Sequence, residues 1–204
     1  MTALTPELLA ALALFAFVSS ITPGPNNAML MASGANFGLK ATVPHLLGVT
    51  GGFFVLVMAV GLGLGGLFAA YPQLHDILSV LGGAYLLWLA WKIGTSKGIS
   101  GGKAGGKPQT FLQAAAFQWV NPKAWAMALG AVTAYAPREN YTTNVLVVSA
   151  IFVAINLPCV LTWTGFGVGL RRFLDKPAVL RGFNIAMALL LVVSLIPLAM
   201  ELLA

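Results

Sequence analysis

The chain has 204 residues, of which 59% are hydrophobic and only 8% are charged. A soluble domain carries about 25% charged residues, so this composition excludes a soluble globular protein and predicts an integral membrane protein. Basic residues exceed acidic ones and give a net charge of +6, but they lie in the connections between apolar stretches, which argues against a nucleic-acid partner.

Six apolar stretches follow one another along the chain, and a helix needs about 20 such residues to cross the hydrocarbon core of a bilayer. They lie near residues 7–33, 43–69, 74–92, 111–135, 144–170 and 182–203. We therefore expect an all-α polytopic membrane protein with six transmembrane helices in a lipid bilayer. The stretches use most of the chain, so residues 1–204 are expected to form a single membrane domain.

The chain divides into two halves, of about residues 1–93 and 111–204, joined by a basic, Gly-rich connection at 94–110. This composition is typical of a flexible linker. Each half has an odd number of expected spans, so the second half enters the membrane in the opposite orientation. Inverted repeats of this kind occur in many secondary transporters, whose sites lie between the repeats. The prediction is two inverted three-helix repeats with broken first and fourth helices.

Lysine and arginine residues concentrate in the odd-numbered connections. Cytoplasmic connections carry the excess of basic residues, so these connections are expected inside the cell and both termini on the periplasmic or exterior side. The basic residues in or beside them are Lys40, Lys92, Lys97, Lys103, Lys107, Arg171, Arg172, Lys176 and Arg181.

The first apolar stretch is interrupted by the sequence TPGPNN at residues 22–27. Pro23 and Pro25 lack an amide N–H and clash with the carbonyls four residues earlier, so they predict a local unwinding between two half-helices. Irregular backbone is tolerated in a membrane only where protein or a water-filled cavity surrounds it. The half-helix that starts near Asn26 presents free N–H groups that favour an anion, such as a substrate carboxylate. A purely structural kink is the alternative.

The fourth apolar stretch contains a second interruption at Asn121-Pro122-Lys123. Asn at the N-cap followed by Pro at the first helical position is a strong helix-start signal. A lysine deep in a span costs at least about 2.5 kcal/mol on insertion scales, which makes Lys123 a functional candidate. Alternatively, its long stem snorkels to the cytoplasmic interface.

Other polar residues in the apolar stretches are weaker candidates. His45 is either a proton acceptor or an interfacial histidine, and Asn156 and Asn184 either face a cavity or form interhelical hydrogen bonds. The acidic residues all lie in connections or near the termini. If transport is coupled to an ion, H+ or Na+, the coupling group is then His45, Lys123 or a set of freed backbone carbonyls.

Small and aromatic residues in the spans have structural interpretations. Pairs of glycines four residues apart are expected to let helices approach closely, either within one protomer or between the two protomers of a homodimer. These pairs are Gly48 with Gly52, Gly61 with Gly65, and Gly165 with Gly169. The aromatic residues expected to anchor the chain at the membrane interface are Tyr71, Trp91, Trp119, Tyr135 and Trp163.

The two interruptions also resemble a known family. TPGPNN in the first span and Asn-Pro-Lys at the start of a half-helix in the fourth are similar to the LysE/RhtB family of amino-acid exporters, and the resemblance covers nearly the whole chain. The segments ITPGPNNAML, GGAYLLWLAWKIGTS and FNIAMALLLV look most like the cysteine/O-acetylserine branch. The resemblance implies that one side of the site is formed by Thr22, Pro23, Gly24, Pro25, Asn26 and Asn27, and the other by Asn121, Pro122 and Lys123.

The resulting functional hypothesis is an inner-membrane exporter of small neutral amino acids or their derivatives, driven by an ion gradient. The alternatives are an exporter of basic amino acids such as lysine or arginine, and an ion or metal permease. An intramembrane enzyme would need a paired catalytic set, but His45 and His75 lie in different segments and no acid lies in mid-span. No catalytic residue, metal ligand or cofactor is therefore predicted.

Overall fold

The computed structural model describes residues 4–95, 107–174, 176–196 and 199–200, and all regular elements in these ranges are helices. The central part of the predicted linker, 96–106, lies outside the described residues. The elements of the first half are α1 (Pro6–Ile21), α2 (Pro25–Phe37), α3 (Leu39–Ala59), the π-helical turn η1 (Val60–Leu64), α4 (Gly65–Ala70) and α5 (Pro72–Gly94). Those of the second half are α6 (Phe111–Phe117), the 3-10 turn η2 (Gln118–Val120), α7 (Pro122–Tyr135), α8 (Tyr141–Leu170), the 3-10 turn η3 (Arg171–Phe173) and α9 (Pro177–Val193).

Proline residues mark where many of these helices begin. The first turns of α1, α2, α5, α7 and α9 contain Pro6, Pro25, Pro72, Pro122 and Pro177, respectively. Proline suits this position because its missing N–H has no intrahelical acceptor there and its φ is already helical. The two helix breaks predicted from proline chemistry, before Pro25 and before Pro122, are both present.

Two helices are long and apolar enough to cross a bilayer by themselves, Leu39–Leu67 and Tyr141–Phe173. The pair formed by α1 and α2 qualifies as a third, bent by 55° at its break. Large apolar side chains cover the outer surface, as expected where lipid replaces water; exposed examples are Leu14, Leu62, Leu112, Phe166 and Leu189. The other predicted spans coincide with α5, α6–α7 and α9, and their crossing of the membrane stays a prediction.

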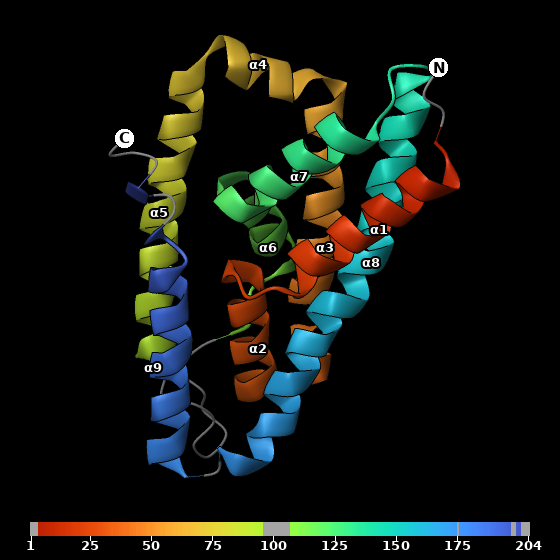
Figure 1. Ribbon diagram of the computed structural model, residues 1–204. Coiled ribbons are helices and arrows are strands. Elements are labelled where there is room, and N and C mark those ends of the chain that lie inside the picture. Colours follow the sequence, from red (N-terminus) through yellow and green to blue (C-terminus); the bar gives the residue numbers. More distant parts are fainter. Residues whose placement is uncertain (1–3, 96–106, 175, 197–198, 201–204) are drawn as a thin grey trace.

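Helix α2 lies at the centre of the molecule, enclosed by neighbouring helices (Figure 1). Every residue from Asn27 to Asn36 is buried. Its tightest partner is α8, and glycines make this contact possible. A Cβ on Gly34 would collide with the backbone oxygen of Thr164, and one on Gly167 with the backbone oxygen of Met31. The packing of α2 therefore depends on close backbone approach.

The predicted glycine pairs behave differently from one another. A Cβ on Gly48 or Gly52 would meet the backbone of α6, so this pair packs closely as expected. In contrast, Gly165 and Gly169 have no heavy atom of the described residues within 4 Å of a Cβ. The prediction of close packing within the protomer was wrong for this pair, because the helix turns Gly167, which lies between them, toward α2.

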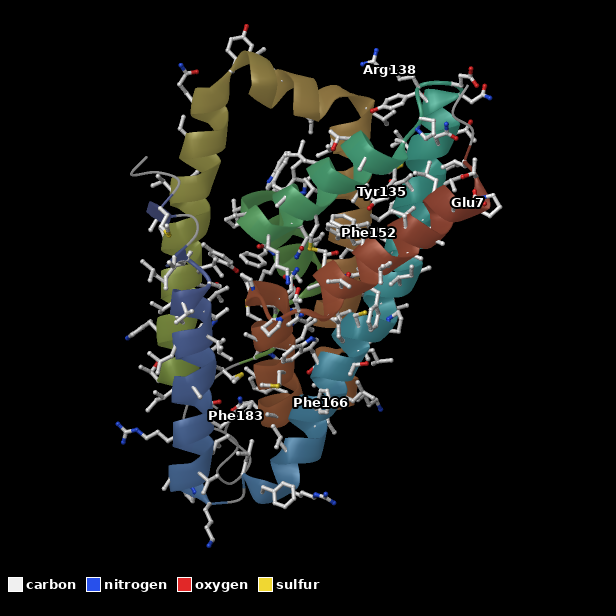
Figure 2. The ribbon with its side chains drawn as sticks, in the orientation of Figure 1. Glu7, Tyr135, Arg138, Phe152, Phe166 and Phe183 are labelled. Atoms are coloured by element: carbon white, nitrogen blue, oxygen red, sulfur yellow. The ribbon has the colours of Figure 1, made fainter. Side chains whose placement is uncertain are left out.

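The upper core is built from α1, α3, α7 and α8 around aromatic rings. Phe152 contacts Phe53 edge-on at a centroid distance of 5.1 Å and Phe15 at 5.8 Å. Phe15 also lies 5.6 Å from Tyr135. Figure 2 shows Phe152 and Tyr135 in the region where α1, α7 and α8 come together. This core holds the slanted half-helices α1 and α7 in place above α2.

Candidate functional site

The first break is a short extended segment between α1 and α2. Thr22 (φ −64°, ψ 142°) and Gly24 (φ −175°, ψ 178°) are both extended. The carbonyls freed at the end of α1 are bonded by side chains rather than by backbone. Asn27 Nδ2 donates to the oxygens of Ser20 (2.9 Å) and Thr22 (2.8 Å), and Trp163 Nε1 donates to the oxygen of Ile21 (3.0 Å).

These bonds assign roles that the sequence patterns did not. Asn27 caps the end of α1 with its amide, so its side chain stabilises the break itself. Trp163 was predicted as an interface anchor, but its indole N–H bonds the break and its side chain is only partly exposed. The Ile21 carbonyl needs this donor, because burying it without one would cost about 1–3 kcal/mol. The anchoring role of Trp163 stays a prediction.

The second break separates η2 from α7. Asn121 is extended (φ −92°, ψ 107°), and its side-chain oxygen accepts a hydrogen bond from the Lys123 amide at 3.2 Å. The Asn-Pro helix start is thus formed as predicted, with Asn121 as the N-cap and Pro122 in the first turn. The cap uses the first available N–H of α7. In contrast, among the residues that the structure describes, no side chain caps the start of α2.

The two breaks meet, and Lys123 joins them. Its Nζ donates to the Thr22 carbonyl at 2.7 Å, to the Thr22 hydroxyl oxygen at 3.0 Å and to the Pro23 carbonyl at 3.2 Å. The ammonium therefore lies at the end of α1, where the carbonyls give the helix its negative pole. Thus the Lys123 side chain extends toward the first break.

A second contact crosses between the breaks in the opposite sense. Asn26 Nδ2 donates to Gln118 Oε1 at 2.8 Å, and Gln118 Nε2 donates to Asn26 Oδ1 at 3.1 Å. Lys123 thus connects the start of α7 to the end of α1. The amide pair of Gln118 and Asn26 connects η2 to the start of α2. Gln118 is fully buried, although nothing in its sequence context distinguished it from other span glutamines.

Gly24 is required at the first break for space rather than for backbone conformation. Its φ of −175° is open to any residue, but a Cβ would lie 2.8 Å from Lys123 Cδ and 3.0 Å from Lys123 Nζ. Distances below 3.0 Å force an atom to move. A side chain at position 24 would therefore displace the lysine.

A small cavity lies at the meeting point of the breaks, which we call the break pocket. It leaves about 20 Å³ for the centres of water-sized molecules, which is room for about one water. Asn156 lines it, donating from Nδ2 to Ser20 Oγ at 3.0 Å, while its buried Oδ1 has no hydrogen-bond partner among the described residues. The other residues around the pocket are Ser19, Ser20, Gly24, Pro25, Asn26, Asn27, Val49, Phe53, Asn121, Lys123, Ala124, Met127 and Val160.

Two of the predicted site residues lie elsewhere. Asn184 of α9 forms an amide pair with Asn36 near the other end of α2, with Asn36 Nδ2 donating to Asn184 Oδ1 at 3.0 Å. His45 of α3 is buried and lines a separate cavity beside the same part of α2. The remaining predicted residues all belong to the two breaks or the break pocket.

Comparison with known proteins shows the family to which this chain belongs. The sequence model of the family described as LysE type translocator matches residues 17–202. The chain is 31% identical over 191 residues to the cysteine/O-acetylserine efflux proteins of Escherichia coli K12 and Shigella sonnei Ss046, covering 93% of this chain and 96% of each relative. No solved structure matches the chain. The protein is therefore a membrane transport protein that belongs to the LysE type translocator family.

Proposed function

We propose that this protein is a secondary active exporter of small neutral amino acids or derivatives, of the cysteine/O-acetylserine kind, in the cytoplasmic (inner) membrane. It works by alternating access between two inverted three-helix repeats, with six spans in all and both termini on the exterior side. A coupling ion, H+ or Na+, supplies the energy. The break pocket is the substrate site.

The observation that carries this proposal is the reciprocal contact between the breaks. Lys123 bonds Thr22 and Pro23, and Gln118 bonds Asn26, so each half of the chain closes on the other at two polar points. Transporters built from inverted repeats place their substrate between broken helices in this way. The orientation is supported by Figure 1, where the α8–α9 junction with its basic residues lies at the opposite end from α4 and the N-terminus.

The chemistry of the pocket suits a zwitterion. The uncapped start of α2 offers backbone N–H groups and a positive helix end for a carboxylate. The unpaired Asn156 Oδ1 offers an acceptor for an α-ammonium group. A basic side chain on the substrate would bring a second cation close to Lys123, and like charges in a site of low dielectric repel strongly. These features favour neutral over basic amino acids.

The break pocket is too small for an amino acid in this conformation, because it has room for only about one water. Substrate binding thus requires the two breaks to move apart. In our proposal Lys123 leaves the carbonyls of Thr22 and Pro23 as the substrate enters, and its ammonium then faces the substrate carboxylate. Because Lys123 bonds either the carbonyls of the first break or the substrate carboxylate, binding of substrate releases this contact between the two repeats.

The test is export from cells preloaded with dipeptides, comparing wild type with Lys123→Ala across cysteine, O-acetylserine, threonine, leucine and lysine. Wild type should export neutral members of this panel, and Lys123→Ala should abolish export without loss of protein from the membrane. Lys176→Ala, which removes an exposed lysine remote from the pocket, is the matched control and should export normally. Wild-type export by Lys123→Ala would show that the lysine only snorkels.

A further inference from the structure

A second cavity lies beside residues 29–37 of α2, farther along the helix than the break pocket, which borders its first turn. It leaves about 90 Å³ for the centres of water-sized molecules, more than the break pocket. Its walls come from α2, α3, α5 and the segment that leads into α6, and its floor is apolar, with Met29, Ala32 and Leu89. We call it the lower chamber.

Three polar side-chain atoms of residues that line the lower chamber lack partners. His45 is only 2% exposed, and neither of its ring nitrogens has a hydrogen-bond partner among the described residues. The same is true of Gln109 Oε1, although its Nε2 donates to Tyr85 Oη at 3.2 Å. Buried polar groups without partners within the protein cost about 1–3 kcal/mol each, so a polar molecule that bonds them is favoured here.

Two other polar residues that line the chamber, both on α2, are hydrogen-bonded within the protein. Ser33 Oγ lies 2.9 Å from Thr42 Oγ1, and Asn36 Nδ2 donates to the Ala32 carbonyl at 2.8 Å. Within the described part of the chain, all buried side-chain polar atoms without a partner line either the lower chamber or the break pocket. The two cavities therefore share one property: each offers unsatisfied hydrogen-bonding groups to a guest.

The charge around the lower chamber defines that guest further. Exposed Lys92 and Lys107 stand in its wall, and no acidic side chain is among its described lining residues. The lysines favour a carboxylate, while Gln109 Oε1 can only accept and so requires an N–H or O–H donor. Neutral His45 provides one donor and one acceptor. A simple anion would leave Gln109 unsatisfied, whereas a free α-amino acid carries both a carboxylate and an ammonium donor.

From these observations we infer that the lower chamber is a second amino-acid site, where substrate loads from the cytoplasm before it reaches the break pocket. The inference rests on the proposed export function and on the inside orientation of the basic connections. The substrate carboxylate lies toward Lys92 and Lys107, and its ammonium toward Gln109. α2 separates this loading site from the break pocket.

The first test counts binding sites on the purified full-length protein by equilibrium dialysis with radiolabelled L-cysteine under a non-thiol reductant. Wild type should bind two molecules per chain, and Gln109→Met should weaken one of them about tenfold or more, as expected for loss of a bond to a charged group. The matched control Gln73→Met changes an exposed glutamine and should keep both. In cells, Gln109→Met should raise the half-saturating cytoplasmic concentration but leave the maximal export rate unchanged.

The second test does not depend on transport. In a Cys159→Ala background, Ser33→Cys places a thiol in the wall of the lower chamber, while Ser149→Cys places one in the buried core as a control. Ser33→Cys should react several times faster with an anionic thiosulfonate reagent than with a cationic one, and Lys92→Gln with Lys107→Gln should remove this preference. Ser149→Cys should react with neither.

The outcomes separate the two proposals. Export by wild type with a single bound cysteine, or with two sites untouched by Gln109→Met, would overturn the loading site and leave the export function standing. Reaction of Ser33→Cys without charge preference would likewise reduce the chamber to a water-filled space. Absence of both export and binding for every member of the amino-acid panel would overturn both proposals.

Discussion

Substituting Gly24 with alanine should act on transport through a residue 99 positions away in the chain. Alanine is compatible with the extended backbone at this position (φ −175°), so the backbone itself is not strained. Its Cβ would, however, lie 2.8 Å from Lys123 Cδ, and the flexible lysine is the group that moves. The expected result is a folded protein in which Lys123 no longer reaches Thr22 and Pro23.

The magnitude follows from the hydrogen bonds that Lys123 would lose. A hydrogen bond to a charged group contributes about 1.5–3 kcal/mol, and Lys123 makes three of them at 2.7, 3.0 and 3.2 Å. Losing the free energy of one such hydrogen bond changes an equilibrium between two conformations by about 10- to 100-fold. We therefore expect Gly24→Ala to lower the export rate by about that factor.

One assay measures the export rate of Gly24→Ala, with membrane protein amounts equalised. Because Lys123→Ala is itself expected to abolish export, the double-substitution cycle is measured on the melting temperature in detergent. In a Lys123→Ala background the clash disappears, so Gly24→Ala should add no further loss; coupling of this kind is what such cycles measure. Gly165→Ala is the control, because nothing described lies within 4 Å of its Cβ. Wild-type export by Gly24→Ala, or decreases in melting temperature that add in the double variant, would refute the reasoning.

Two further substitutions test the frame around the site. Asn27→Asp replaces the amide that donates to the Ser20 and Thr22 carbonyls with a carboxylate that faces the same two oxygens. It should therefore destabilise the protein by at least about 1–3 kcal/mol, measured as a lower melting temperature in detergent. An unchanged melting temperature would mean that the amide does not hold the break. Gly167→Ala should also destabilise the protein by about 1–3 kcal/mol, as overpacking does, because the new Cβ would collide with the Met31 backbone. A monodisperse chromatography profile with wild-type thermal stability would contradict the close approach of α2 and α8.

Local chemistry made part of this structure predictable from sequence. Pro23, Pro25 and Pro122 disfavour regular helix in the residues just before them, so both breaks were predicted at the right residues. The N-cap role of Asn121 is local in the same way, since cap and helix start lie within two residues.

Contacts between distant segments were beyond the same reasoning. Nothing in the residues near Gln118 reveals that it pairs with Asn26, or that Trp163 bonds the carbonyl of Ile21. His45 illustrates the opposite error. It was a weaker candidate for the site because it is polar and lies in a span, but the position of α3 against the lower half of α2 places it in another cavity. Polarity in a span thus indicates a polar environment but not which one.

The short length of α2 has a consequence for the energetics of export. Its 13 residues extend about 20 Å, less than the roughly 30 Å of bilayer hydrocarbon. An elementary charge that crosses the whole field gains or loses about 2.3 kcal/mol per 100 mV. A zwitterion carries no net charge, so voltage can drive its export only through a co-transported ion or the displacement of Lys123.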